Sequence, residues 1–149
     1  MLAAGCAGYG DDDEEETREP ASTQAAPPVP QPESRTGSLP VAEFNAFLDR
    51  TRPAFATSAL RTALEFANVG EGQAASTSVE VEEGVEGNSG EASVTVTRDG
   101  LADDSIRAVR YVVILERNGD GTWRVRSAKR LQRCHQGRGH QDFSPQLCT

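Results

Sequence analysis

The side chains with the widest capacity for chemistry gather in the last sixteen residues of the chain. They are Cys134, His135, His140, Asp142, Ser144 and Cys148. Thiols and imidazoles ligate zinc, and two thiols form a disulfide. A histidine near an acid and a hydroxyl is a familiar part of nucleophilic catalysis. The tail therefore admits three interpretations: a zinc site, a disulfide loop and a catalytic site.

Spacing weakens the zinc and catalytic interpretations without removing either. Zinc would need Cys134, His135, His140 and Cys148, but the first two are adjacent, and tetrahedral sites usually use spaced pairs. His140 and Asp142 lie close to Ser144, yet no nucleophile elbow surrounds that serine.

Two residues inside this tail are candidates for ligand or partner contact. Arg138 and His140 could hold an anion, because a guanidinium binds carboxylate or phosphate in a bidentate manner. Alternatively, both bond to backbone carbonyls and hold the loop, and we favour this structural interpretation.

The third cysteine, Cys6, directly follows the run Leu-Ala-Ala-Gly at positions 2–5. This run resembles the lipobox that ends the signal peptide of bacterial lipoproteins, where the cysteine sulfur is acylated. The resemblance implies that residues 1–6 are the remnant of such a signal and that Cys6 is the lipidation site. It also implies an extracytoplasmic protein that is lipid-anchored at the cell membrane. An expected polar tether after Cys6 fits this interpretation.

If Cys6 carries lipid, an even pair of cysteines remains in an oxidising compartment. We therefore expect a disulfide between Cys134 and Cys148 that closes the loop 134–148. The cysteine-bounded tail is also similar to those of some uncharacterised actinobacterial lipoproteins, a resemblance that implies no known activity.

Residues 7–37 have the composition of a spacer. Asp11–Glu16 is an uninterrupted acidic block, and six of the eight prolines lie between Pro20 and Pro40. Such a segment buries too little apolar surface to offset its ordering entropy, so we predict a disordered acidic and proline-rich tether. The formal net charge of -8 argues against non-specific nucleic-acid binding. No phosphate loop or H-E-x-x-H motif occurs, and no cofactor is expected.

Residues 38–149 are predicted to form one α+β domain. Apolar residues recur at helical spacing over about 38–51 and again over about 53–68. Alternation with a period of two then predicts strands near 77–82, 92–97, 106–116 and 122–131. This order, with the run 120–125, resembles the cystatin-type and nuclear-transport-factor-type cone folds. The resemblance implies N-terminal helices packed on a curved four-stranded antiparallel sheet.

The register of the last two strands decides which side chains face the helices. A bulged three-residue loop, with Gly119 or Gly121 at positive φ, would place one set of residues on the concave face. It would pair Leu115 with Trp123, Val113 with Val125, and Tyr111 with Ser127. The residues expected to line a concave pocket are Tyr111, Val113, Leu115, Trp123 and Ser127. These side chains offer few groups for acid–base catalysis near neutral pH.

The opposite face of the same strands carries a candidate contact patch. Val112 and Ile114 are apolar, and Arg124 and Arg126 would surround them. We therefore expect a non-catalytic, lipid-anchored binding or accessory module of the bacterial cell envelope. Its partner would be an envelope protein or a small ligand. The alternatives are a small-ligand-binding or enzymatic cone-fold domain and a zinc-binding domain.

Overall fold

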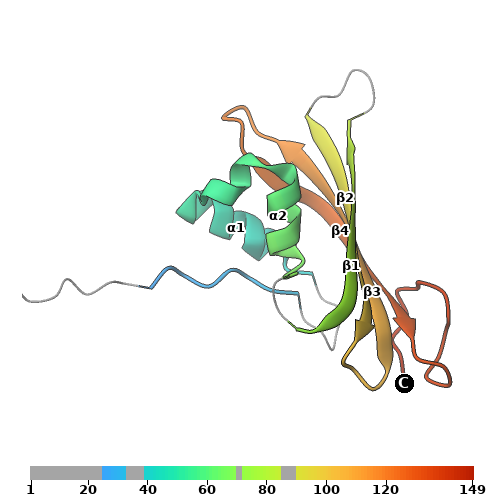
Figure 1. Ribbon diagram of the computed structural model, residues 1–149. Helices are drawn as coiled ribbons and strands as arrows, with labels where there is room; N and C mark the ends of the chain where they lie inside the picture. Colours follow the sequence, from blue (N-terminus) through green and yellow to red (C-terminus); the bar gives the residue numbers. More distant parts are fainter. Residues whose placement is uncertain (1–24, 33–38, 70–71, 85–89) are drawn as a thin grey trace, which may run out of the picture.

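The computed structural model describes residues 25–32, 39–69, 72–84 and 90–149, and it confirms the α+β fold. The helical elements are α1 (Val41–Thr51), the 3-10 helix η1 (Ala54–Thr57) and α2 (Ala59–Phe66). The strands are β1 (Ala74–Glu83), β2 (Glu91–Leu101), β3 (Ile106–Arg117) and β4 (Trp123–Cys134). Both α-helices lie on one face of a twisted sheet (Figure 1). None of the helices in the described ranges is long and apolar enough to span a membrane.

The sheet is an antiparallel meander in the order β1–β2–β3–β4. The helices pack on β2, β3 and β4, where Val94, Val113 and Leu115 are completely buried. On β1, Val79 and Val81 lie on the same face as these residues, but 39% and 42% of their surface stays exposed. β1 is therefore an edge strand whose helix-facing side is left largely uncovered.

Three phenylalanines anchor the helices to the sheet. Phe44 and Phe47 come from α1, and Phe66 is the last residue of α2. The rings of Phe44 and Phe66 meet edge to face with centroids 5.1 Å apart, and both residues are fully buried. On α1, apolar positions three and four residues apart place Phe44, Phe47 and Leu48 on one stripe, and this stripe faces the sheet.

The helices begin and end differently from the sequence prediction. Residue 38 lies outside the described ranges, and Pro40 occupies the N-cap position of α1. The predicted continuous helix over 53–68 is wrong, because Ser58 adopts an extended backbone between η1 and α2. The Ser58 hydroxyl accepts a hydrogen bond from the Arg61 N–H at 3.4 Å and so caps α2.

The predicted register of the last hairpin is wrong. Leu115 pairs with Val125 rather than Trp123, and Val113 pairs with Ala128. The bulge lies within β4 and not in the loop, since Arg126 is the extra residue between two successive pairs. Gly121 does adopt the expected positive φ, at 86°. The consequence is that Ser127 is exposed on the outer face, opposite Ile114, instead of lining the concave side.

Part of the predicted tether contacts the domain. Within residues 25–32, Val29 is partly buried and packs against the core, and Pro32 lines a pocket under the helices. The disordered tether over 7–37 stays a prediction, and within its described residues 25–32 the apolar side chain of Val29 covers part of the domain surface. Residues 1–24 and 33–38, including Cys6, lie outside the described ranges.

Gly100 lets β1 and β2 approach closely, and replacing it by alanine is expected to destabilise the fold by about 1–3 kcal/mol. Its φ is +68°, and a Cβ there would lie 2.5 Å from the Ala75 Cβ. Urea unfolding of Gly100→Ala would measure the loss. Gly119→Ala is the matched control, because nothing lies within 4 Å of a Cβ at Gly119. Equal stability of the two variants would contradict this account.

Candidate functional site

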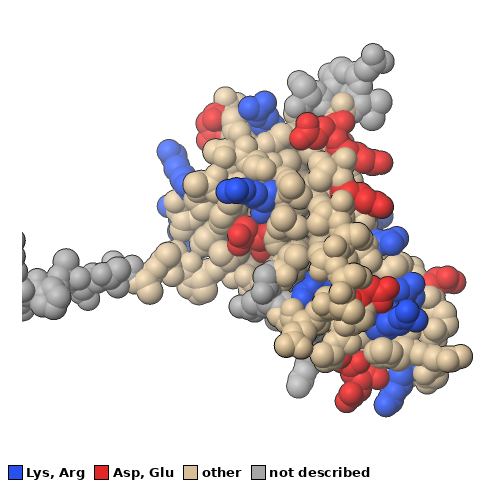
Figure 2. All heavy atoms as spheres, in the orientation of Figure 1, with Lys and Arg blue, Asp and Glu red and all other residues tan. Residues whose placement is uncertain are grey.

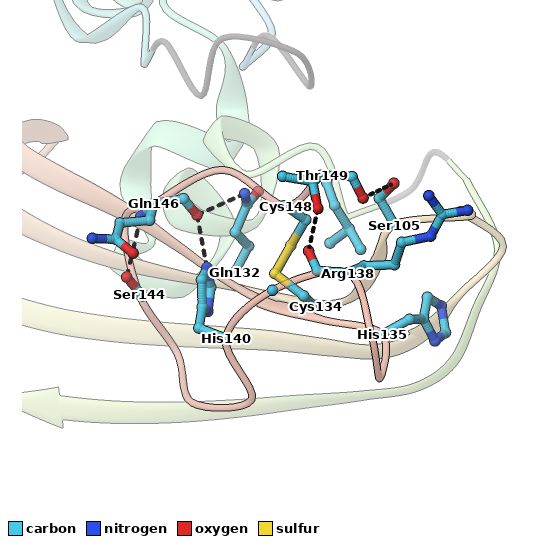
Figure 3. Close-up of a disulfide and its surroundings, with 12 residues drawn as sticks. Ser105, Gln132, Cys134, His135, Arg138, His140, Ser144, Gln146, Cys148 and Thr149 are labelled. Carbon is cyan, nitrogen blue, oxygen red and sulfur yellow. Dashed lines mark hydrogen bonds between the residues drawn. A yellow bond between two sulfur atoms is a disulfide. The ribbon is translucent and has the colours of Figure 1, made fainter.

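The C-terminal tail folds back on the end of β4 and is closed by a disulfide between Cys134 and Cys148 (Figure 3). The two Cα atoms lie 5.5 Å apart, and Cys134 is completely buried. The backbone N–H of Cys134 donates to the His140 carbonyl at 3.0 Å, and that of Thr149 donates to the Arg138 carbonyl at 2.9 Å. The tail is thus held by covalent and hydrogen bonds along its length.

One carbonyl oxygen joins the tail to the sheet. The Gln146 carbonyl accepts a hydrogen bond from Gln132 Nε2 at 2.8 Å, and His140 Nε2 lies 2.9 Å from it. Gln132 is a buried residue of β4, 1% exposed, and its backbone pairs with that of Ser144. Its Oε1 accepts from the Arg130 guanidinium at 2.8 Å. Gln132 therefore connects the tail to an arginine on the helix-facing side of the sheet.

Three of the four candidate zinc ligands come together. Ligand atoms of Cys134, His140 and Cys148 lie within 4.8 Å of one another, whereas His135 is not part of this cluster. The sulfur atoms are bonded to each other, and both ring nitrogens of His140 face carbonyl oxygens, that of Asp142 at 2.8 Å and that of Gln146. A ring nitrogen that donates a proton to a carbonyl offers no lone pair to a metal.

The candidate catalytic residues make structural contacts. His140 Nδ1 faces the backbone carbonyl of Asp142 and not its carboxylate. The Ser144 hydroxyl accepts from the Gln146 N–H at 3.2 Å, and its backbone pairs with Gln132. These contacts fit the structural interpretation of the loop. The Arg138 side chain is exposed and has no bonding partner among the described residues.

The outer face of the sheet only partly resembles the predicted patch. Val112 and Ile114 are half-buried, and Arg126 of β4 reaches across β3 to form an ion pair with Glu91 of β2. Arg124 instead turns toward α1, where its guanidinium lies 3.8 Å from the Asp49 carboxylate. The two arginines therefore do not surround one surface.

The concave side of the sheet holds a pocket of about 380 Å³, but at the opposite end from the predicted one. Of the five residues expected there, only Tyr111 lines it. Val113 and Leu115 are completely buried in the core, and Trp123 lies at the far end of the sheet. The walls come from the end of α2, the β2–β3 turn and the inner faces of β2, β3 and β4. They include Ala67, Leu101, Ile106, Val109, Arg98 and Arg130.

Two arginines lie in the pocket wall on either side of β3. Arg98 is opposite Val109, and Arg130 is opposite Tyr111. Arg98 donates to the Gly72 carbonyl at 2.7 Å, and the Nε of each arginine is buried without a hydrogen-bond partner. In the described part of the chain, neither guanidinium has a carboxylate within 4.0 Å. Both side chains are only partly buried, and among the described residues the shielded Nε atom of each is left without the partner that buried N–H groups normally have.

The pocket also contains an ionised carboxylate. Asp103 Oδ1 accepts from the backbone N–H of Ile106 at 2.6 Å and of Ser105 at 2.8 Å. The bond from Ile106 is the chief reason why the pKa of Asp103 falls below its usual 3.8, and partial burial opposes the shift. The positive charge of Arg130 lowers the pKa further. Asp103 is therefore a fixed anion at neutral pH and a poor proton donor.

This shift predicts a pH-dependent stability. The bonds to Asp103 stabilise the folded state above pH 3.8, where the carboxyl is ionised in the folded and unfolded chain. That contribution is lost as the pH falls from 3.8 through the lower pKa of the folded state. Asp103→Asn is expected to reduce stability at pH 7, and the difference from wild type should narrow below pH 3.8. Thermal unfolding between pH 2 and 7 measures both, and a constant difference contradicts the account.

Neither pocket arginine was predicted from the sequence, although the alternation in β2 indicated the position of Arg98. Arg98 continues the alternation of Ala92, Val94 and Val96, so it occupies a position on the buried face. Arg130 was missed because the predicted register placed it on the outer face. The bulge at Arg126 moves each later residue of β4 to the opposite face from the predicted one.

Comparison of the chain with protein-family models, with curated proteins and with solved structures finds no match.

Proposed function

We propose that this chain is a lipid-anchored binding module of the bacterial cell envelope, held outside the cytoplasm through Cys6, and that it catalyses no reaction. The observation that carries the proposal is the Cys134–Cys148 disulfide, which fastens the tail to the sheet. Disulfides persist in oxidising compartments and are rare in the cytosol. The lipobox-like run before Cys6 supplies a mode of attachment that fits such a compartment.

The arrangement of polar groups supports binding over catalysis. Asp103 has a lowered pKa, which suits a charge partner better than a general acid. His140, the histidine in the disulfide loop, directs both ring nitrogens at backbone carbonyls. What the domain offers instead is a pocket with mixed apolar and charged walls, the usual character of a small-molecule site.

The test of anchoring is metabolic labelling in an actinobacterial host, with the chain expressed from its own gene. Wild type should incorporate an alkyne fatty acid and fractionate with the membrane, and Cys6→Ser should lose both properties. The matched control is Cys134→Ala with Cys148→Ala, which removes two thiols and should keep the label. Unlabelled wild type in the soluble fraction, with Cys134 and Cys148 reduced, overturns the proposal.

A zinc-binding function is the second candidate, favoured by the convergence of Cys134, His140 and Cys148. It requires the reduced thiols, because a bonded sulfur pair provides no thiolate. Protein purified without a histidine tag would contain about one zinc per chain if this function is correct. Protein with no free thiol and no zinc rejects it.

A further inference from the structure

We propose that the pocket under α2 binds a small organic monocarboxylate, with the carboxylate between Arg98 and Arg130 and the apolar part against Leu101, Ile106 and Val109. The inference rests on the proposed function only in treating the chain as a binding module. It names a ligand class and a site that do not depend on the lipid anchor.

The charges in the pocket select an anion. Arg98 and Arg130 contribute two positive charges, and neither has an ion-pair partner within 4.0 Å among the described residues. Asp103 contributes one negative charge, which its two backbone hydrogen bonds keep ionised. Among the described residues that line the pocket, one positive charge is left without compensation. A ligand with a single negative charge balances the pocket, whereas a phosphate dianion would exceed that balance.

Hydrogen bonds to protein oxygens fix both arginine side chains in the pocket wall. Each uses one terminal nitrogen on a protein oxygen, Arg98 on the Gly72 carbonyl and Arg130 on Gln132 Oε1. A guanidinium has five N–H donors, so each retains donors for a carboxylate. Because they lie on the strands flanking β3, the two side chains approach the same space from opposite sides.

The remaining walls suit an apolar body next to the charged group. Leu101 and Ile106 are only partly buried, and Val109 lies beside them at 5% exposure. Tyr111 lines the same space, and its hydroxyl forms no hydrogen bond within the described residues. A volume of about 380 Å³ falls in the range of small-molecule sites. The pocket thus combines an apolar wall, an arginine pair and a tyrosine hydroxyl.

The experiment uses the full chain with Cys6→Ser, so that acylation plays no part. The probe is 2-naphthoate, its neutral counterpart is 2-naphthamide, and inorganic phosphate is the third compound. Calorimetric titration should show binding of the naphthoate and at least about tenfold weaker binding of the amide and of phosphate. Backbone amide shifts on naphthoate addition should be largest at Gly72, Leu101 and Ile106.

Variants locate the carboxylate. Arg98→Gln and Arg130→Gln should each weaken naphthoate binding by about tenfold or more, because each removes a charge-assisted hydrogen bond. Arg61→Gln, an equal charge change on the exposed side of α2, should leave it unchanged. If a pocket variant fails to fold, the wild-type shift map decides.

Each of these results overturns the proposal: no naphthoate binding, equal binding of the amide, tighter binding of phosphate, or shifts centred outside the pocket. An equal loss in Arg61→Gln would also overturn it, because the effect would then be one of net charge. None of these outcomes touches the fatty-acid label on Cys6. Failure of the ligand site and failure of membrane anchoring are therefore separate results.

Discussion

Replacing Cys134 and Cys148 by alanine is expected to lower the free energy of unfolding by about 3 kcal/mol. The disulfide joins residues 14 positions apart, and a closed loop of this length restricts the unfolded chain. Hydrogen bonds such as the backbone pairing of Gln132 with Ser144 also hold the tail, but its exposed segment around Gly137 and Gly139 buries almost no apolar surface. Alanine fits the fully buried position of Cys134 without introducing an unpaired polar group.

Urea denaturation at neutral pH measures this loss, with Cys6→Ala as the matched control. That control removes a thiol that forms no bridge in the proposed pairing, and its stability should equal that of wild type. Wild type treated with a reductant should approach the stability of the double variant. If the double variant unfolds at the same urea concentration as wild type, the disulfide contributes nothing to the stability of the domain.

Phe44→Ala is expected to cost about 3–5 kcal/mol, the largest loss from any single substitution considered for this chain. Phe44 is completely buried, and its ring meets the fully buried Phe66 edge to face. Truncation would remove that aromatic contact and leave a cavity between α1 and the sheet. In a domain of this size such a loss approaches the whole stability.

Calorimetry or urea unfolding would detect the change, and Leu60→Ala supplies the comparison. Leu60 lies on α2 and is 37% exposed, so its truncation should cost well under half as much. A Phe44 variant as stable as the Leu60 variant would mean that α1 is not anchored through this ring. If the Phe44 variant lost its helical circular-dichroism signal while the sheet stayed folded, the helices and the sheet would not share a single core.

The sequence predicted the elements well and their detailed pairing poorly. The alternation of apolar and polar residues in β2 and β3 predicts which side chains are buried, because every second side chain enters the core. In the same way, the apolar stripe with Phe44 and Phe47 predicts which face of α1 packs on the sheet. The break between η1 and α2 was missed, since Ser58 leaves the apolar spacing intact while its backbone turns extended.

The pocket could not be predicted because it depends on tertiary pairing. A single extra residue, Arg126, reverses the orientation of everything that follows in β4, and no local pattern marks that position. The disulfide partners were correctly predicted by counting cysteines, whereas the neighbours of His140 come from a tail conformation that the sequence does not specify. The contact of Val29 with the core likewise needs the assembled surface.

The open edge of β1 has a consequence for self-association. An exposed strand with unpaired backbone groups invites another copy to extend the sheet into a growing oligomer. Glu80, Glu82 and Glu83 line this strand, and acidic side chains cluster over it in Figure 2. Two copies joining there would bring like charges together, which opposes growth at neutral pH. Where the molecules are crowded on a surface, this repulsion would keep them separate.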